Sequence, residues 1–128
     1  MKIEDLVSQM MTINTKARLW HWMTDTAQHH VTYEQFLTQN ETHTDSLMES
    51  AMGNEYPLTM SAIGVNAATE PGYSLDKARN ELKDYRGKVI EMKAALDSSD
   101  QTGSDELVTI LDNVVELTSK TLYLLRLK

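Results

Sequence analysis

Apolar residues recur at steps of three and four along most of the chain, which is the period of an amphipathic α-helix. The pattern predicts four helices, at about residues 3–22 and 26–52 and from near Ser74 and Ser104 onward. The side chains expected in the core are Ile3, Leu6, Met10, Ile13, Ala17 and Trp20, then Tyr33, Leu37, Leu47, Met48 and Ala51, then Leu75, Ala78, Leu82, Tyr85, Val89, Met92 and Leu96, then Leu107, Ile110, Leu111, Val114, Leu117, Thr121, Leu124 and Leu125. The expected fold class is all-α.

The connections between the predicted helices indicate how they are arranged. Only a few residues separate the first two helices, and the short polar segment 97–103 separates the last two, so both pairs should be antiparallel. The segment 53–73 is long for a loop inside a compact domain, and a crossover along the bundle explains its length. One long crossover is the connectivity of the ferritin-like four-helix bundle. Residues 1–128 are therefore expected to form a single ferritin-like four-helix domain with one long crossover between helices 2 and 3.

Composition and charge restrict the classes of partner. The chain has 128 residues, of which 41% are hydrophobic, and a formal net charge of −7. Direct DNA binding is not expected, because this charge opposes a phosphate backbone and no Lys/Arg cluster offsets it. There is no cysteine, so the sequence has no disulfide framework and no thiolate metal site. No apolar run approaches the roughly 18 residues of a membrane span, and no signal peptide opens the chain, so a cytoplasmic protein is expected.

Five metal-ligand residue types stand out in the first half of the chain. His30, Glu34, Asp45 and Glu49 lie in the second predicted helix at steps of four, eleven and four. At about 100° per residue these steps keep all four side chains on one side of the helix. His21 closes the first predicted helix and can reach the His30 end across the short turn. Imidazole and carboxylate ligands together suit iron, manganese or zinc.

The spacing along the helix predicts that the site needs two chains. Glu34 and Asp45 are about 16 Å apart along a helix axis, too far to hold one metal ion together. Two antiparallel copies of this helix, related by a twofold axis near Gln39–Asn40, bring the two groups together in an isologous dimer. The predicted site comprises His21, His30 and Glu34 of one subunit with Asp45 and Glu49 of its mate. A di-metal centre inside one chain is disfavoured, because no Glu-x-x-His motif is present.

Structural explanations compete with the metal site. An acidic margin on an amphipathic helix is most often a solvated surface, although five ligand types in register favour a metal site. We expect His29 and His43 to be surface residues, and Trp20 and Trp22 to serve packing. Glu41 lies on the same side of the helix as His30, Glu34, Asp45 and Glu49, which is called the ligand sector. Near the axis it would either form a like-charge pair with its own copy or guide iron to the site.

The same residues carry a family resemblance. The stretch Leu19-Trp20-His21-Trp22, followed by His30-x-x-x-Glu34 and Asp45-x-x-x-Glu49, resembles the Dps miniferritins. In that family a His-Trp pair ends the first helix, and His-x-x-x-Asp and Asp-x-x-x-Glu follow on the second. Glu34 stands where the family has an aspartate. The whole chain is also similar to a compact branch of the family encoded by tailed phages.

The resemblance implies a function. It implies an enzyme that oxidises Fe(II), with hydrogen peroxide as oxidant, at sites between subunits made of the five residues named above. It further implies sequestration of ferric iron in a shell of twelve subunits, with zinc or manganese as substitute metals. A phage-encoded member would work in the host cytoplasm. The alternative is a helical dimer that binds a protein partner and retains a vestigial metal site.

Overall fold

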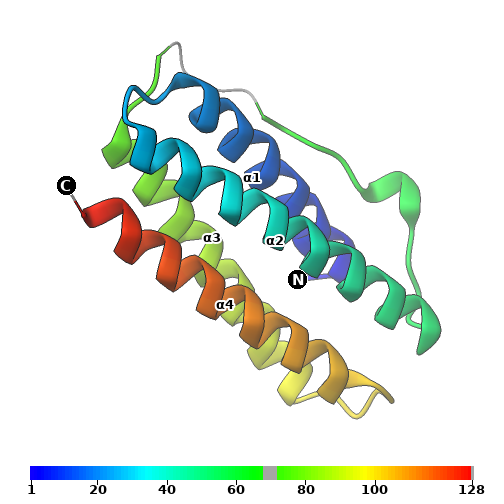
Figure 1. Ribbon diagram of the computed structural model, residues 1–128. Helices are drawn as coiled ribbons and strands as arrows, with labels where there is room; N and C mark the ends of the chain where they lie inside the picture. The colour runs from blue at the N-terminus through cyan, green and yellow to red at the C-terminus, as the bar shows by residue number, and fades with distance from the viewer. Residues whose placement is uncertain (68–71, 128) are drawn as a thin grey trace.

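The structure is a bundle of four long helices. The computed structural model describes residues 1–67 and 72–127. The helices are α1 (Ile3–Met23), α2 (Ala27–Gly53), α3 (Leu75–Asp97) and α4 (Ser104–Arg126), with a short 3₁₀ helix η1 (Met60–Ala62) between α2 and α3 (Figure 1). The described residues contain no strand. The predicted all-α class is confirmed, and the predicted helix limits agree to within about one residue.

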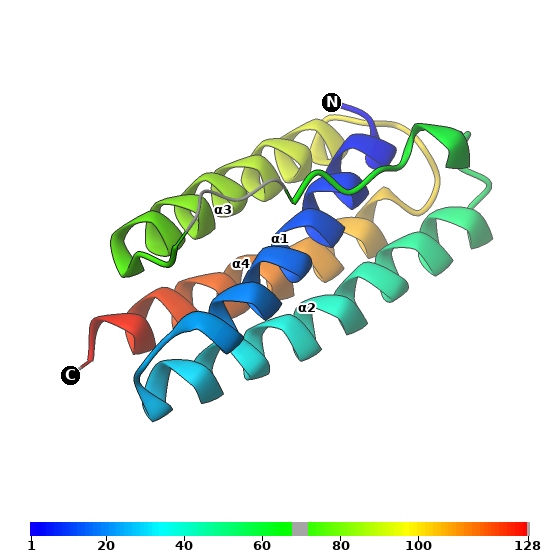
Figure 2. The same ribbon diagram turned by 90° about the horizontal axis from the view of Figure 1, so that it is seen from above.

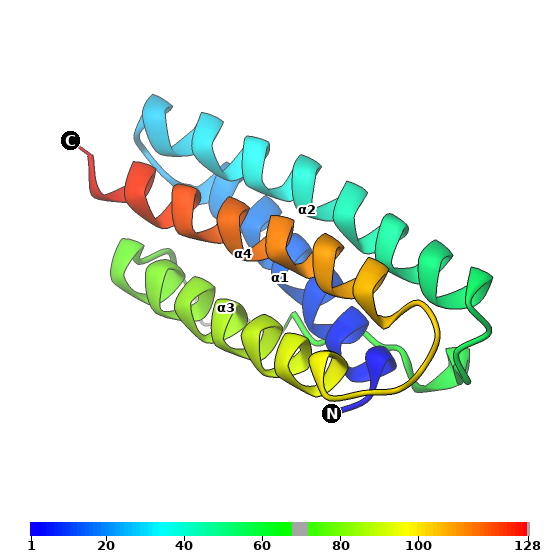
Figure 3. The ribbon, with the colours of Figure 1, turned by 90° about the horizontal axis from the view of Figure 1, so that it is seen from below.

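Each helix packs against two others. α1 contacts α2 and α3, and α4 contacts α2 and α3 (Figures 2 and 3). The ribbon shows that every neighbouring pair runs antiparallel, with α2 and α3 on a diagonal. The α1–α2 turn, the start of α3 and the end of α4 all lie at one end of the bundle, which is called the turn end below.

The segment that follows α2 runs along α1. Three of its backbone N–H groups donate to side-chain oxygens about one helical turn apart: Thr59 to Glu4 at 3.1 Å, Gly64 to Ser8 at 3.0 Å and Asn66 to Thr12 at 3.1 Å. Ile63, Leu58 and Tyr56 pack against the core. These contacts give the long connection a place on the bundle surface, as far as residue 67.

The core largely follows the predicted apolar faces. Every predicted residue of α1 is buried, while Met48, Leu75, Ile110 and Leu124 are only partly buried. Phe36, at 1% exposure, is a core residue that the prediction omitted. His29 was expected at the surface, and this is wrong, because its side chain is only 9% exposed. The reason is its position four residues before Tyr33, on the buried side of α2.

A polar network crosses the core. Tyr85 on α3 donates its hydroxyl to Asn40 Oδ1 at 2.6 Å, and Asn40 Nδ2 donates to Asn14 Oδ1 on α1 at 2.8 Å. Asn40 is fully buried. Burial raises the pKa of Tyr85 well above its usual range, so the phenol remains a hydrogen-bond donor at any ordinary pH. This network ties α1, α2 and α3 at the same level of the bundle.

At the end of the bundle opposite the turn end, hydrogen bonds hold the start of α4 against the end of α2. Asn54 Nδ2 and Ser50 Oγ both donate to Glu106 Oε2, at 3.0 and 2.8 Å. These hydrogen bonds, from Ser50 and then Asn54, lower the pKa of Glu106. Gly103, which precedes α4, has a φ of 88°, and a Cβ there would overlap the Asn54 side chain.

Gly103→Ala should therefore destabilise the protein, because it adds a strained φ to a steric overlap, and a loss of more than about 1 kcal/mol is expected. Gly87→Ala is the matched control. Gly87 lies inside α3 with open space around the added carbon, so this change should stabilise by roughly 0.5–1 kcal/mol. Urea unfolding of both variants measures the difference. Equal stabilities would contradict the conformation assigned to Gly103.

Tyr85→Phe should leave Asn40 Oδ1 buried without its donor, at a cost of about 1–3 kcal/mol in unfolding free energy. Tyr123→Phe is the control, because Tyr123 is 56% exposed and its hydroxyl makes no hydrogen bond within the described part of the chain. Denaturant midpoints of the two variants give the comparison. A Tyr85→Phe variant as stable as Tyr123→Phe would show that the network contributes nothing.

Candidate metal site

His21 and His30 form a reciprocal pair across the α1–α2 turn. Their rings stack with centroids 3.7 Å apart and an interplanar angle of 21°. His21 Nδ1 lies 2.8 Å from the backbone oxygen of His30, and His30 Nδ1 lies 2.7 Å from the backbone oxygen of His21. The sequence predicted that these two residues would meet, and the structure brings them together.

The reciprocal contacts fix the tautomer of both rings. A carbonyl oxygen accepts but cannot donate, so each Nδ1 must carry the proton that forms the hydrogen bond. In the neutral ring Nε2 then holds the lone pair, and neither Nε2 has a hydrogen-bond partner among the described residues. A metal-binding histidine usually donates its other N–H to a carbonyl in this way. The pair is therefore pre-organised to offer two imidazole nitrogens.

The predicted carboxylates lie at two levels of α2. Glu34 is exposed one turn after His30. Asp45 and Glu49 are exposed on the second half of the helix, three turns further on. In the described part of a single chain, no three His, Asp or Glu side chains gather closely enough to hold a metal ion. One subunit thus brings the two histidines together but gathers none of the three carboxylates with them, and the two-chain arrangement stays a prediction.

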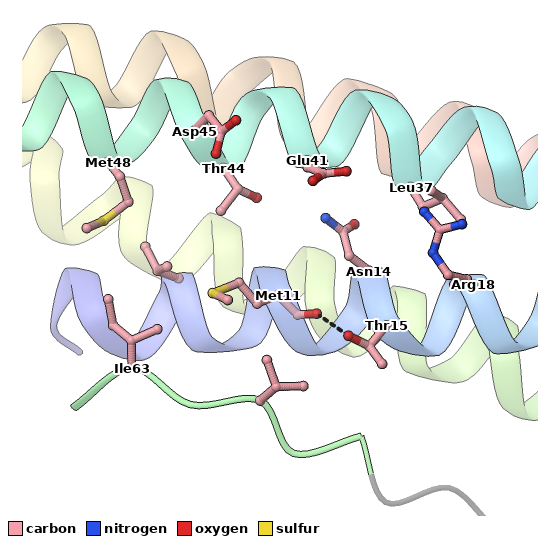
Figure 4. Close-up of a pocket in the computed structure, with 12 residues that line it drawn as sticks. Met11, Asn14, Thr15, Arg18, Leu37, Glu41, Thr44, Asp45, Met48 and Ile63 are labelled. Atoms are coloured by element: carbon pink, nitrogen blue, oxygen red, sulfur yellow. Dashed lines mark hydrogen bonds between the residues drawn. The ribbon is translucent and has the colours of Figure 1, made fainter. Parts of the chain in front are cut away.

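An open groove of about 500 Å³ runs beside this sector, between α1 and α2. Figure 4 shows Glu41 of α2 facing Asn14 of α1, with Asp45 one turn further along α2 and the Arg18 side chain of α1 extending toward Leu37. Its apolar lining is Val7, Met11, Leu37, Met48, Ile63 and Val65. Glu41 therefore shares a face with Asp45, as its spacing predicted, and the groove combines an apolar floor with carboxylates.

Asn40 is not on that face. The predicted twofold axis was placed near Gln39–Asn40, but the Asn40 side chain is fully buried in its own bundle. Gln39, at the same level of the helix, is exposed, and the axis itself stays a prediction. A contact with a second copy would therefore have to be made by exposed residues of α2 and not by Asn40.

Large apolar side chains lie next to the two histidines in sequence. Trp22 is 65% exposed, and Met23 and Val31 are 42% and 47% exposed. Trp20 is buried and its ring lies 5.6 Å from that of Tyr33, so it serves packing as predicted. Trp22 does not, because two residues after Trp20 on the same helix its side chain lies on the exposed side.

Comparisons of the chain with protein-family models, curated proteins and solved structures gave no match. Among the described helices, none is both long enough and apolar enough to cross a membrane.

The tautomer assignment can be tested by long-range ¹H–¹⁵N NMR of the metal-free protein at about pH 8. His21 and His30 should both show the Nδ1–H form, which is the less common one in free histidine. His43 makes no side-chain hydrogen bond in the described structure and serves as the internal comparison. Nε2–H forms at His21 and His30 would contradict the reciprocal pairing.

Proposed function

We propose that this protein is a ferritin-like iron-binding protein that oxidises Fe(II) at sites shared between two subunits. The observation that supports it best is the His21–His30 pair, whose Nε2 lone pairs are free at the surface. If the two rings served only packing, neither ring would have to be held in one particular tautomer. Here both protons are held by backbone oxygens, which favours a cation as the partner of the other nitrogens.

Glu34 would complete the half-site of the first subunit. It lies one turn from His30 on the same side of α2, and its carboxylate would reach an ion bound at the imidazoles after a change of side-chain rotamer, because the three groups do not gather in the described part of one chain. Asp45 and Glu49 of a second, antiparallel copy would supply the remaining oxygens. Imidazole with several carboxylates is a ligand set for iron, and zinc or manganese would compete for it.

The shape of one subunit is compatible with such a dimer. The groove beside Asp45 is apolar at its floor and wide enough to receive side chains from another helix. Trp22 and Val31 at the other end of the sector are exposed in the single chain. Covering these side chains would contribute hydrophobic free energy to association.

The ferritin-like assignment also uses the connection after α2. In that connectivity one long crossover links the second and third helices of the bundle. The contacts of Thr59, Gly64 and Asn66 along α1 agree with such a path. Closure of the subunits into a shell is a separate property, and the mass of the native particle measures it.

The proposed reaction takes iron as its substrate. Each of two Fe(II) ions gives up one electron, and together these reduce one hydrogen peroxide, with two protons, to two water molecules. The ferric product would be retained by the assembly. Four neighbouring carboxylates would favour the higher charge of Fe(III), namely those of Glu34, Glu41, Asp45 and Glu49. Glu41 would also attract incoming Fe(II) along the groove.

A different function follows if the groove acts without the metal. Its apolar lining and the exposed Trp22 would then serve a helical dimer that binds a protein partner, with the histidine pair as a remnant. Native mass measured together with metal content separates the two functions. A metal-free dimer favours the second, and a larger iron-containing particle favours the first.

Purified protein mixed with Fe(II) and peroxide should develop ferric absorbance, and the double variant His30→Ala/Glu49→Ala should lose at least about 90% of that rate, because each site then lacks one ligand from each subunit. The control is His43→Ala/Glu91→Ala, which removes the same residue types outside the ligand sector. Equal rates in the two double variants would refute the ferroxidase function.

Mixed subunits test whether the site is shared. Co-expression of His30→Ala with Asp45→Asn/Glu49→Gln chains concentrates all the lesions of a hybrid dimer in one site and leaves the other intact. With statistical mixing, about one quarter of the wild-type rate should return. No recovery in a confirmed hybrid would place all the ligands within one chain.

A further inference from the structure

The turn end of the bundle contains a second pocket, separate from the metal-site groove. It is open, has a volume of about 760 Å³, and lies between the start of α2, the start of α3 and the end of α4. Its lining is Thr26, Ala27, Gln28, His29, Leu75, Arg79, Leu125, Arg126 and Leu127. None of the described residues that line it carries a carboxylate, although the chain as a whole carries a net charge of −7.

Three polar side chains in this pocket lack partners among residues 1–67 and 72–127. Arg79 Nε is enclosed by protein and donates to none of these residues. His29 is only 9% exposed, and neither of its ring nitrogens makes a hydrogen bond in the described structure. Arg126 makes no ion pair among the described residues. A desolvated donor without an acceptor is costly, most of all in a guanidinium, so Arg79 Nε and the buried His29 ring indicate a missing acceptor, and the exposed Arg126 adds a second positive charge beside them.

The helix ends add to the positive potential. The first N–H groups of α2, at Ala27 and Gln28, have no acceptor within the helix, and they carry the positive end of its dipole. The His29 N–H is already accepted by Thr26 Oγ1 at 3.3 Å. The nearest acidic residues in sequence, Asp25 and Asp76, are exposed and outside the pocket lining. Arg126 also offsets the negative end of α4.

The rest of the wall is apolar. Leu75 begins α3, Leu125 lies in the last turn of α4 and Leu127 directly follows that helix, and all three face the same space as the two arginines. An inorganic anion would leave this surface in contact with water. A ligand with a charged oxyanion head and a short hydrocarbon body satisfies both parts of the lining.

We propose that the turn-end pocket binds a small organic anion, with its carboxylate or phosphate head held by Arg79, Arg126 and His29 and its apolar body against the three leucines. The guanidinium groups are suited to either head, since both present oxygens in the geometry that arginine recognises. The site is independent of iron and of the dimer.

The test uses metal-free protein and three probes that differ only in the head group: hexanoate, hexyl phosphate and hexanol. Titration is followed by NMR at the Arg79 Nε–H and the His29 ring. Both anions should shift these signals saturably. Hexanol should bind at least about tenfold more weakly than either anion. The ratio of the two anion affinities then identifies the head group that the pocket prefers.

Variants show whether binding is at this pocket. Arg126→Gln lies at the exposed end of α4 and should fold normally, and it should weaken anion binding about tenfold, as should Arg79→Gln. Arg18→Gln, in the groove between α1 and α2, is the matched control and should bind as the wild type does. Hexanol binding as tightly as the anions, or an Arg126→Gln affinity equal to that of Arg18→Gln, would overturn the proposal.

Discussion

The short turn between α1 and α2 is the constraint on which the functional surface depends. Only residues 24–26 separate the two helices, so α2 must return directly along α1. This return fixes which residues of the two helices lie opposite one another, and it places His21 against His30 next to the turn. The two Nδ1 contacts then fasten the turn, since each ring donates to the other residue's backbone. The groove, with its carboxylates, follows from the same register further along the pair.

The polar network at Asn40 gives this register a second fixed point. Apolar contacts tolerate small slips along a helix, because any hydrocarbon surface suits another. A buried amide that must meet both Tyr85 and Asn14 does not, because a slip would leave its donors and acceptor unpaired. The histidine pair at one end and the amide in the middle therefore determine how α2 presents Glu41, Asp45 and Glu49 to the outside.

Much of the fold could be predicted from the spacing of apolar residues, and the exceptions have physical reasons. Asn40 and His29 are polar, so a rule based on hydrophobicity assigned neither to the core. Both continue the three–four spacing of Tyr33, Leu37 and Thr44, which is the signal that could have placed them inside. The meeting of His21 with His30 followed from the short turn, but the exchange of backbone contacts depends on ring orientation and could not be predicted. The part of the site that needs a second chain stays a prediction. No sequence pattern indicated the turn-end pocket, because its residues come from three separate helix ends.

The segment along α1 is held differently from the helices it connects. Its three backbone donors reach side chains of α1 that are 54–56 residues away in sequence, and much of its own surface is exposed. Both helical hairpins can form from local contacts, so these distant bonds should be made late in folding and broken first. Breaking them exchanges three hydrogen bonds for bonds to water and exposes the apolar contacts of Leu58 and Ile63, but it leaves the four helices packed. Because Ile63 and Val65 form one wall of the groove beside Asp45, such local detachment would widen the groove without unfolding the bundle.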